Sequence, residues 1–236
     1  MFIVSFLTLF LICLVSGITF IITYKSNNES NFLVLVKSID GEIMQNYGSN
    51  AYWISFNKTL RMANYAMYNL ETTNSNRCSK TLKQDIKLNS LHTNDYKYSN
   101  LDRGHLVPSK DVENSCDTFV MSNIVPQLPC FNRGIWKKVE DYIRYYYEDF
   151  DILTVPEYDY KYYHINNGVK LYIPTGFYKI AMDSNSVVCS IYLKHNFETC
   201  GKNIEDVAIF GKLPYMLDQK TITKKCWCLQ NKESWC

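Results

Sequence analysis

Hydrophobic and polar residues alternate over several short segments of the chain, and one longer segment has a helical period. In residues 132–147, Ile135, Val139, Tyr142 and Tyr146 recur at spacings of four, three and four. This spacing places the four side chains on one face of an amphipathic helix. Short apolar and aromatic segments are typical of β-strands, and they cover residues 61–70, 119–122, 170–173, 176–181, 187–193 and 207–210. Strands that flank one clear helix predict a mixed α+β domain.

The N-terminal segment has a different pattern. Residues 2–22 carry no charge and are mostly apolar, which is long enough to span a bilayer as a helix. A cleaved signal peptide fits as well, because Val15, Ser16 and Gly17 offer small residues near a cleavage point. A buried helix of a soluble domain is the third interpretation. We prefer the first two and expect a leader over residues 1–24, a single domain over residues 25–236, and a location that is secreted or membrane-anchored through residues 2–22.

The cysteines agree with a compartment outside the cytosol. Cys13 lies in the leader, and the remaining eight form an even set that favours disulfides. Zinc is the rival interpretation, but the Cys-Trp-Cys spacing near the C-terminus is tighter than usual and no His follows it. The connectivity is open, and residues 221–236 are expected to form a disulfide-stapled tail. The disulfide candidates are Cys78, Cys116, Cys130, Cys189, Cys200, Cys226, Cys228 and Cys236.

Composition narrows the class of protein. The chain has 236 residues, of which 47% are hydrophobic and 20% are charged, so disorder, collagen and coiled coil are excluded. The net charge of +2 argues against a protein that coats nucleic acid. This net charge is the sum of segments of opposite sign: residues 77–97 are basic and residues 148–159 are acidic. We expect the basic segment to be an exposed loop. A few well-placed cations remain sufficient for an enzyme that must release its product.

The residue types of a phosphodiesterase site gather between residues 101 and 144. Hydrolysis of a phosphodiester needs a base for water and positive charge near the phosphate. His105 can serve as the base because its ordinary pKa is near neutral, and Arg103 offers a forked cation for phosphate oxygens. Asn132 offers hard oxygen to Mg²⁺, which keeps several waters and takes few protein ligands.

Helix spacing assigns further roles. Asn132 and Glu140 are eight residues apart, or about 12 Å along a helix. Only one of the two is therefore expected to ligate a given ion directly. Glu140 would then act through metal-bound water. Arg144 follows Glu140 by four residues, so the two side chains can hold each other while Arg144 faces phosphate.

Three motifs in this segment resemble those of the DNA/RNA non-specific endonuclease family, the ββα-metal nucleases. They are Asp-Arg-Gly-His at 102–105, Ser-Asn-Ile-Val-Pro-Gln at 122–127, and Asn-Arg-Gly-Ile-Trp-Lys-Lys-Val-Glu at 132–140, with a basic residue four positions later. The resemblance implies a central antiparallel sheet with an inserted ββα-metal motif. It covers about residues 45–215.

The resemblance also implies a role for each matching residue. His105 would be the general base, and Asn132 would be the sole direct protein ligand of Mg²⁺ or a similar divalent ion such as Mn²⁺. Glu140 would position metal-bound water, and Arg103 and Arg144 would stabilise the transition-state phosphate. Further candidates are Asp102 and Asn123, which would orient their neighbours, and Arg77, Lys137 and Lys138, which would contact substrate.

Several conspicuous residues have plainer interpretations. His92, His164 and His195 lie in no motif and are expected to be structural. Trp136 is expected to anchor the core. The tyrosines at 145–147 are expected to serve packing and the surface rather than base stacking.

We therefore expect a Mg²⁺-dependent endonuclease that cuts DNA and RNA without sequence preference. The first alternative is a catalytically inactive binding or scaffold protein on the same fold, and the second is a cell-surface adhesion domain. The sequence leaves the oligomeric state open, including a homodimer.

Overall fold

A computed structural model describes residues 23–25, 31–33, 42–48, 51–71, 78–183 and 186–217 of the chain. The expected leader is almost wholly outside these residues, and Arg77, Cys226, Cys228 and Cys236 are outside them too. Among the described residues, no helix has both the length and the apolar character required to cross a membrane.

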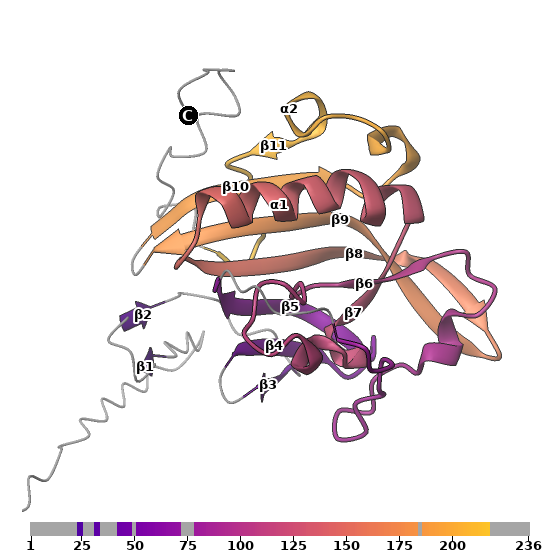
Figure 1. The fold of residues 1–236 in the computed structure, drawn as a ribbon. Coiled ribbons are helices and arrows are strands. Elements are labelled where there is room, and N and C mark those ends of the chain that lie inside the picture. Colours follow the sequence, from indigo (N-terminus) through magenta and orange to yellow (C-terminus); the bar gives the residue numbers. More distant parts are fainter. Residues whose placement is uncertain are drawn as a thin grey trace, which may run out of the picture.

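The fold is built on a seven-stranded sheet in the order β11-β10-β9-β8-β5-β4-β3 (Figure 1). Every neighbouring pair in it is antiparallel. The expected α+β class with a central antiparallel sheet is confirmed. The strands are β3 Glu42–Tyr47, β4 Tyr52–Asn57, β5 Met62–Asn69, β8 Asp151–Asn166, β9 Val169–Asp183, β10 Ser186–Lys194 and β11 Ile209–Phe210. Two short strands, β1 Thr23–Lys25 and β2 Asn31–Leu33, pair with each other.

A ββα unit is inserted between β5 and β8. Its strands β6 Asp102–His105 and β7 Ile124–Gln127 form a separate antiparallel pair. A π-helix, η4 Phe131–Trp136, follows and continues directly into α1 Lys137–Tyr146. The remaining short helices are η1 Thr93–Tyr96, η2 Ser115–Thr118, η3 Met121–Asn123, η5 Phe197–Thr199 and α2 Ile204–Val207.

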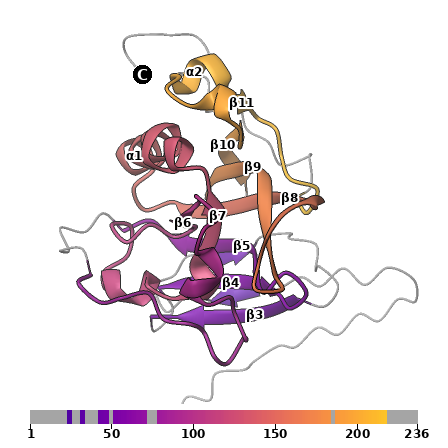
Figure 2. The same cartoon turned by 90° about the vertical axis from the view of Figure 1, so that its right-hand side faces the viewer.

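Helix α1 lies across one face of the sheet, over β9 and β10 (Figures 1 and 2). Ile135 and Trp136 of η4 and Val139 and Ile143 of α1 are buried in a cluster that includes Phe177 of β9. The opposite face of the sheet is covered by the segment after β11, which contributes Leu213, Met216 and Leu217. Apolar burial on both faces is the main stabilising contribution in such a layered fold.

The predicted helix is confirmed, with one change to its buried face. Ile135 and Val139 are fully buried as expected, but Ile143 completes the stripe and Tyr146 is exposed. Tyr146 is the last residue of α1, and its ring packs against Tyr142 and Tyr145 instead of the sheet.

The prediction of a strand at residues 119–122 is wrong. The chain forms the 3-10 helix η3 there, and β7 begins only at Ile124. The side chain of Asn123 bonds the backbone of Val107 and Thr118, and such side-chain bonds compete with extended structure. The segment at 207–210 is strand only at Ile209–Phe210, because Val207 closes α2.

The sequence pattern missed several strands and divided one. It did not predict β3, β4, β6, β7 or β8, and its candidates at 170–173 and 176–181 form the single strand β9. Asn167 and Gly168, both with positive φ, make the tight turn between β8 and β9.

The loop expected to be basic and exposed is partly buried. Of its described residues, Asp85, Leu88, Ser90 and Leu91 are buried. Asp85 accepts hydrogen bonds from Tyr47 and Ser122, so the loop is tied to β3 and to η3 by a polar cluster.

The expected disulfides are confirmed for the described cysteines. Cys78 is bonded to Cys116, and Cys130 is bonded to Cys200. Cys189 is disulfide-bonded as well. Cys130 directly precedes the π-helix, so its bond fixes the start of that helix to η5.

Candidate active site

The β6–β7 hairpin presents the residues of the Asp-Arg-Gly-His motif. Asp102 pairs with Gln127, and His105 pairs with Ile124. Gly104 faces the fully buried Gln127, and a Cβ atom at Gly104 would lie 2.3 Å from the side chain of Gln127. Only glycine therefore fits at this position, which explains the third residue of the motif.

Asp102 joins the hairpin to the π-helix. Its carboxylate accepts hydrogen bonds from Asn132 Nδ2 at 2.9 Å, from Arg133 Nε at 2.8 Å and from Arg133 Nη2 at 2.6 Å. Burial by itself would raise the pKa of Asp102, but the bonds from Arg133 and Asn132 hold it below its usual value. Asp102 is therefore ionised at neutral pH and orients both neighbours.

The π-helix sets the position of Asn132. Single π turns are common at functional sites, where the wider i→i+5 bonding displaces a side chain. The backbone N–H of Asn132 donates to Leu128 O at 2.9 Å, and Leu128 N–H donates to His195 Nε2 at 2.7 Å. His195 Nδ1 then donates to Pro174 O at 2.7 Å, which fixes the tautomer.

His195 is thus structural, as the sequence predicted. Burial lowers the pKa of His195 to about 4, so the ring is neutral and can accept the bond from Leu128. Phe131 and Phe177 pack edge-on against the ring.

Asn123 holds the chain that leaves His105. Its Oδ1 accepts from Val107 N–H at 3.0 Å, and its Nδ2 donates to Val107 O and Thr118 O, both at 3.1 Å. The backbone of Asn123 also accepts from Leu106 N–H at 3.0 Å. These bonds satisfy a fully buried amide and position the two residues that follow His105. The imidazole of His105 packs against Phe119, with ring centroids 5.2 Å apart.

A buried lysine lies between His105 and α1. Lys179 is fully buried, and its Nζ donates to Thr154 Oγ1 at 2.8 Å and to Leu106 O at 3.3 Å. Burial lowers the pKa of Lys179 while the carboxylates of Glu140 and Asp111 oppose that shift. Burial conversely raises the pKa of Glu140, and Lys179 is the strongest opposing influence. The two groups therefore compensate each other in a poorly solvated place.

Arg144 is held by two carboxylates. Its Nε donates to Asp111 Oδ1 at 2.8 Å, and its Nη1 donates to Asp141 Oδ1 at 2.8 Å. Asp111 is buried and also accepts from Tyr68 Oη at 2.8 Å. The sequence paired Arg144 with Glu140. The hydrogen bonds correct that pairing, because Asp111 arrives from a loop far away in the sequence.

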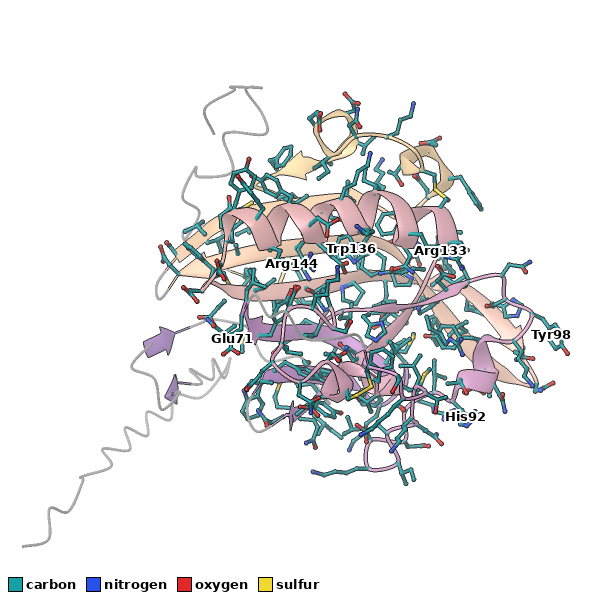
Figure 3. The ribbon with its side chains drawn as sticks, viewed as in Figure 1. Glu71, His92, Tyr98, Arg133, Trp136 and Arg144 are labelled. Atoms are coloured by element: carbon teal, nitrogen blue, oxygen red, sulfur yellow. A yellow bond between two sulfur atoms is a disulfide. The ribbon has the colours of Figure 1, made fainter. Side chains whose placement is uncertain are left out.

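The candidate residues are distributed around this unit. Figure 3 shows Arg133 and Arg144 toward opposite ends of the helical segment, with Trp136 between them. Trp136 is fully buried, as expected for a core anchor. The side chain of Arg103 is exposed.

Two of the three side chains expected to contact substrate, Lys137 and Lys138, bond other groups of the protein. Lys137 pairs with Asp141 at 2.5 Å, and Lys138 donates to Lys202 O and Asn203 Oδ1, both at 3.3 Å. Arg77 lies outside the described residues, so its role stays a prediction.

A family model described as DNA/RNA non-specific endonuclease matches residues 38–203. This match covers most of the chain and includes all three motifs. The chain belongs to the DNA/RNA non-specific endonuclease family.

Individual relatives in this family match shorter segments. A nuclease of Nostoc sp. is 34% identical over 107 residues, which are 40% of this chain and 38% of that protein. The mitochondrial nuclease EXOG of Danio rerio is 32% identical over 43% of this chain and 33% of its own length. A nuclease of Serratia marcescens is 28% identical over 63% of this chain and 62% of its own length. The chain thus spans about a third of the length of the first two relatives, 38% and 33%.

A solved structure has the same fold. The crystal structure titled as the EndoG/EndoGI complex, concerning the mechanism of EndoG inhibition, superposes with a TM-score of 0.61. The match covers 79% of this chain and 89% of that chain at 21% sequence identity. It confirms the ββα unit inserted in an antiparallel sheet as the fold of this family member.

The structure adds site residues that the sequence analysis missed. Arg133 and Asp111 fix Asp102 and Arg144, respectively. Lys179 bonds the backbone beyond His105 and acts on the Glu140 carboxylate through its charge. Lys179 had a usable signal, because it is a single lysine within an otherwise apolar strand segment, residues 176–182. Asp111 had none, since its partners come from β5 and α1.

The donor set around Asn132 fits a hydrated Mg²⁺. The amide nitrogen of Asn132 is committed to Asp102, which turns the amide oxygen away from that carboxylate. Within the described residues, no three His, Cys, Asp or Glu side chains are grouped to hold a metal. One hard oxygen suits an ion that keeps most of its waters, as Mg²⁺ does.

Proposed function

We propose that this family member is a Mg²⁺-dependent endonuclease that hydrolyses DNA and RNA without sequence preference. The observation that carries the proposal is the hydrogen bond between Asp102 and Asn132. It joins the strand that ends in His105 to the helix that carries the metal-binding amide, so a base and a cation can act at one phosphate. The names of the relatives, which are nucleases, support the same activity.

Each residue would act through its own chemistry. His105 would take a proton from the attacking water, since imidazole is a good base near neutral pH. Arg103 and Arg144 would donate to the phosphate oxygens as negative charge grows on them. Contacts to phosphate and sugar carry no base information, which is consistent with cleavage of both polymers.

The metal would be held by the side-chain oxygen of Asn132. A bound Mg²⁺ supplies positive charge next to the phosphate and lowers the barrier to attack. Glu140 would accept hydrogen bonds from water near that site. Lys179 would keep the Glu140 carboxylate in one place.

We also propose that the protein works outside the cytosol, either released or held by its leader. The disulfides Cys78–Cys116 and Cys130–Cys200 support an oxidising compartment. The uncharged apolar residues 2–22 support export.

The direct test is cleavage of supercoiled plasmid and of single-stranded RNA by the full purified chain. We expect conversion to short fragments with Mg²⁺ and none with excess chelator. His105→Ala should lower the rate by several orders of magnitude while circular dichroism remains unchanged. Lys194→Ala is the control, because Lys194 is an exposed residue at the end of β10 with no assigned role in the site, and it should cleave like wild type.

Two results would overturn the proposal. One is a wild-type chain that binds nucleic acid with Mg²⁺ but leaves every phosphodiester intact, which would favour the scaffold alternative. The other is cleavage that continues unchanged in His105→Ala, which would remove His105 as the base.

A further inference from the structure

Tyr98 is held in an unusual and exposed conformation four residues before Asp102. Its φ is +62°, a left-handed conformation that bulky side chains rarely adopt. Its side chain is nevertheless 87% exposed, so no core packing compensates the strain. Residues held in such sparsely populated backbone regions cluster at functional sites.

The distal half of the β8–β9 hairpin exposes more aromatic rings. Tyr158 pairs with Pro174 and Tyr163 pairs with Tyr172, so the four residues 159–162 lie opposite Ile173 alone. This bulge turns Tyr160 and Tyr162 out of the ladder, and they are 60% and 59% exposed. Tyr163 and Ile165 are also exposed.

The hairpin and Tyr98 belong to one surface. Asn166, next to the hairpin turn, donates to Asn94 O at 2.9 Å and to Asp95 O at 3.4 Å. These bonds fasten the hairpin to η1, which ends two residues before Tyr98. Figure 3 shows Tyr98 beside the end of the hairpin. We name Tyr98, Tyr160, Tyr162, Tyr163 and Ile165 the tyrosine surface.

The charges around the tyrosine surface suit a polyanion. Lys97, Lys161 and Lys170 are exposed within it, and Lys170 Nζ lies 4.5 Å from the centroid of the Tyr163 ring. The two nearby aspartates are occupied locally. Asp95 accepts from His92 N–H at 2.7 Å, and Asp159 accepts from Lys161 N–H at 3.1 Å.

The tyrosine surface lies near the candidate active site along the chain. Tyr98 precedes Arg103 by five residues, so their Cα atoms are at most about 18 Å apart. That distance corresponds to about five nucleotide steps at the spacing of a duplex strand, and to fewer steps of an extended single strand. One strand that lies in the site is therefore long enough to reach the tyrosine surface.

We propose that the tyrosine surface binds a single-stranded segment of the nucleic-acid substrate by stacking unpaired bases on its rings. This inference rests on the proposed nuclease function and adds a substrate preference to it. Exposed aromatic rings interleaved with lysines are how sequence-independent proteins hold single strands, because every base offers a π-face. Bases within a duplex are already stacked, so a duplex gains less from the tyrosine surface.

The test is equilibrium binding of a short fluorescein-labelled oligodeoxyadenylate and of a duplex of equal length. The full chain with His105→Ala serves as the background, so that the probe is not cut. The variant adds Tyr98→Asn, which suits a left-handed backbone, and Tyr162→Ser. We expect the Kd for the single strand to rise at least about fivefold, since one base–aromatic stack contributes that much or more. The Kd for the duplex should change less than about twofold on the same reasoning.

The matched control is Tyr145→Ser, which removes a ring that is 79% exposed on α1. It should leave both Kd values unchanged. Equal weakening of single strand and duplex by Tyr98→Asn/Tyr162→Ser would overturn the single-strand claim. Unchanged binding by that variant would overturn the tyrosine surface as a binding site. If the tyrosine variant instead abolishes concentration-dependent self-association in sedimentation without changing either Kd, the surface binds a second copy and the proposal fails.

These outcomes can be told apart from failure of the proposed nuclease function. The nuclease function is tested separately, by cleavage of plasmid with Mg²⁺ by the unmodified chain, and it fails if that chain does not cleave. A chain that cleaves normally with Tyr98→Asn/Tyr162→Ser on both single-stranded and duplex substrates would keep the nuclease function and reject the tyrosine surface.

Discussion

The side-chain amide of Asn132 donates a hydrogen bond of 2.9 Å to the carboxylate of Asp102, thirty residues earlier in the chain. Arg133 Nη2 forms an ion pair with Oδ1 of the same carboxylate at 2.6 Å. One carboxylate therefore orients the amide that is proposed to bind the metal, and it is itself oriented by the next residue along the helix. In that proposal Asp102 is a positioning residue.

Replacing Asp102 should weaken the metal site more than the fold. Asp102→Asn removes the charge that Asn132 and Arg133 bind, and loss of such a supporting group commonly costs about 10–100-fold in metal affinity. We expect the Mg²⁺ concentration for half-maximal cleavage to rise by about that factor. Unfolding in urea should change by less than about 1 kcal/mol, because Arg133 is largely exposed. Lys138→Met, which alters an exposed cation on α1, should leave the Mg²⁺ dependence unchanged.

Removing the buried charge of Lys179 should destabilise the protein strongly. Lys179→Met keeps the volume but removes the strongest compensating positive charge on the buried Glu140 carboxylate, and leaving a buried charge uncompensated costs about 3–5 kcal/mol. Urea unfolding of wild type and variant measures this loss. Lys194→Met removes an exposed lysine from the same sheet and should change stability by less than about 0.5 kcal/mol. A stable Lys179→Met variant would show that the network is dispensable.

His195 should make stability depend on mildly acidic pH. Its folded pKa is about 4, against an ordinary value of 6.5, so the unfolded chain binds more protons between these two values. Stability from His195 is therefore complete above about pH 6.5 and is lost as pH falls toward 4, by up to about 3 kcal/mol. His195→Ala should lower stability at neutral pH and flatten this dependence, as measured by urea unfolding at several pH values. An unchanged pH profile in the variant would contradict the assignment.

The two disulfides should differ in their effect on catalysis. Cys130–Cys200 closes 70 residues and is anchored two positions before Asn132, whereas Cys78–Cys116 closes 38 residues. Replacing either pair with serine should cost about 2–5 kcal/mol in stability. Only the Cys130→Ser/Cys200→Ser variant should also raise the Mg²⁺ requirement for cleavage, because it releases the π-helix. Equal Mg²⁺ requirements in both double variants would show that the Cys130 bond acts on stability alone.

Sequence patterns were most informative where an interaction is local. The helical period after Asn132 predicted the helix, and the glycine of the Asp-Arg-Gly-His motif has a steric reason in the contact with Gln127. The sequence patterns failed at residues 119–122. There the hydrogen bond between Val107 and the Asn123 side chain accompanies the 3-10 helix η3 in place of the expected strand. The strand β8 was missed because five acids in residues 148–159 hid its apolar positions.

The sequence by itself determined the family and the candidates for the reactive groups, because His105, Asn132 and Glu140 stand in ordered motifs that need no folded context to be recognised. It also determined that most cysteines would be oxidised. Only the tertiary structure decided the partners of those groups. Asp111 for Arg144, Lys179 for Glu140 and His195 for Leu128 lie 33 to 67 residues away or on another element of the sheet. Charges and hydrogen bonds of this kind depend on burial, and burial is set by how distant segments pack together.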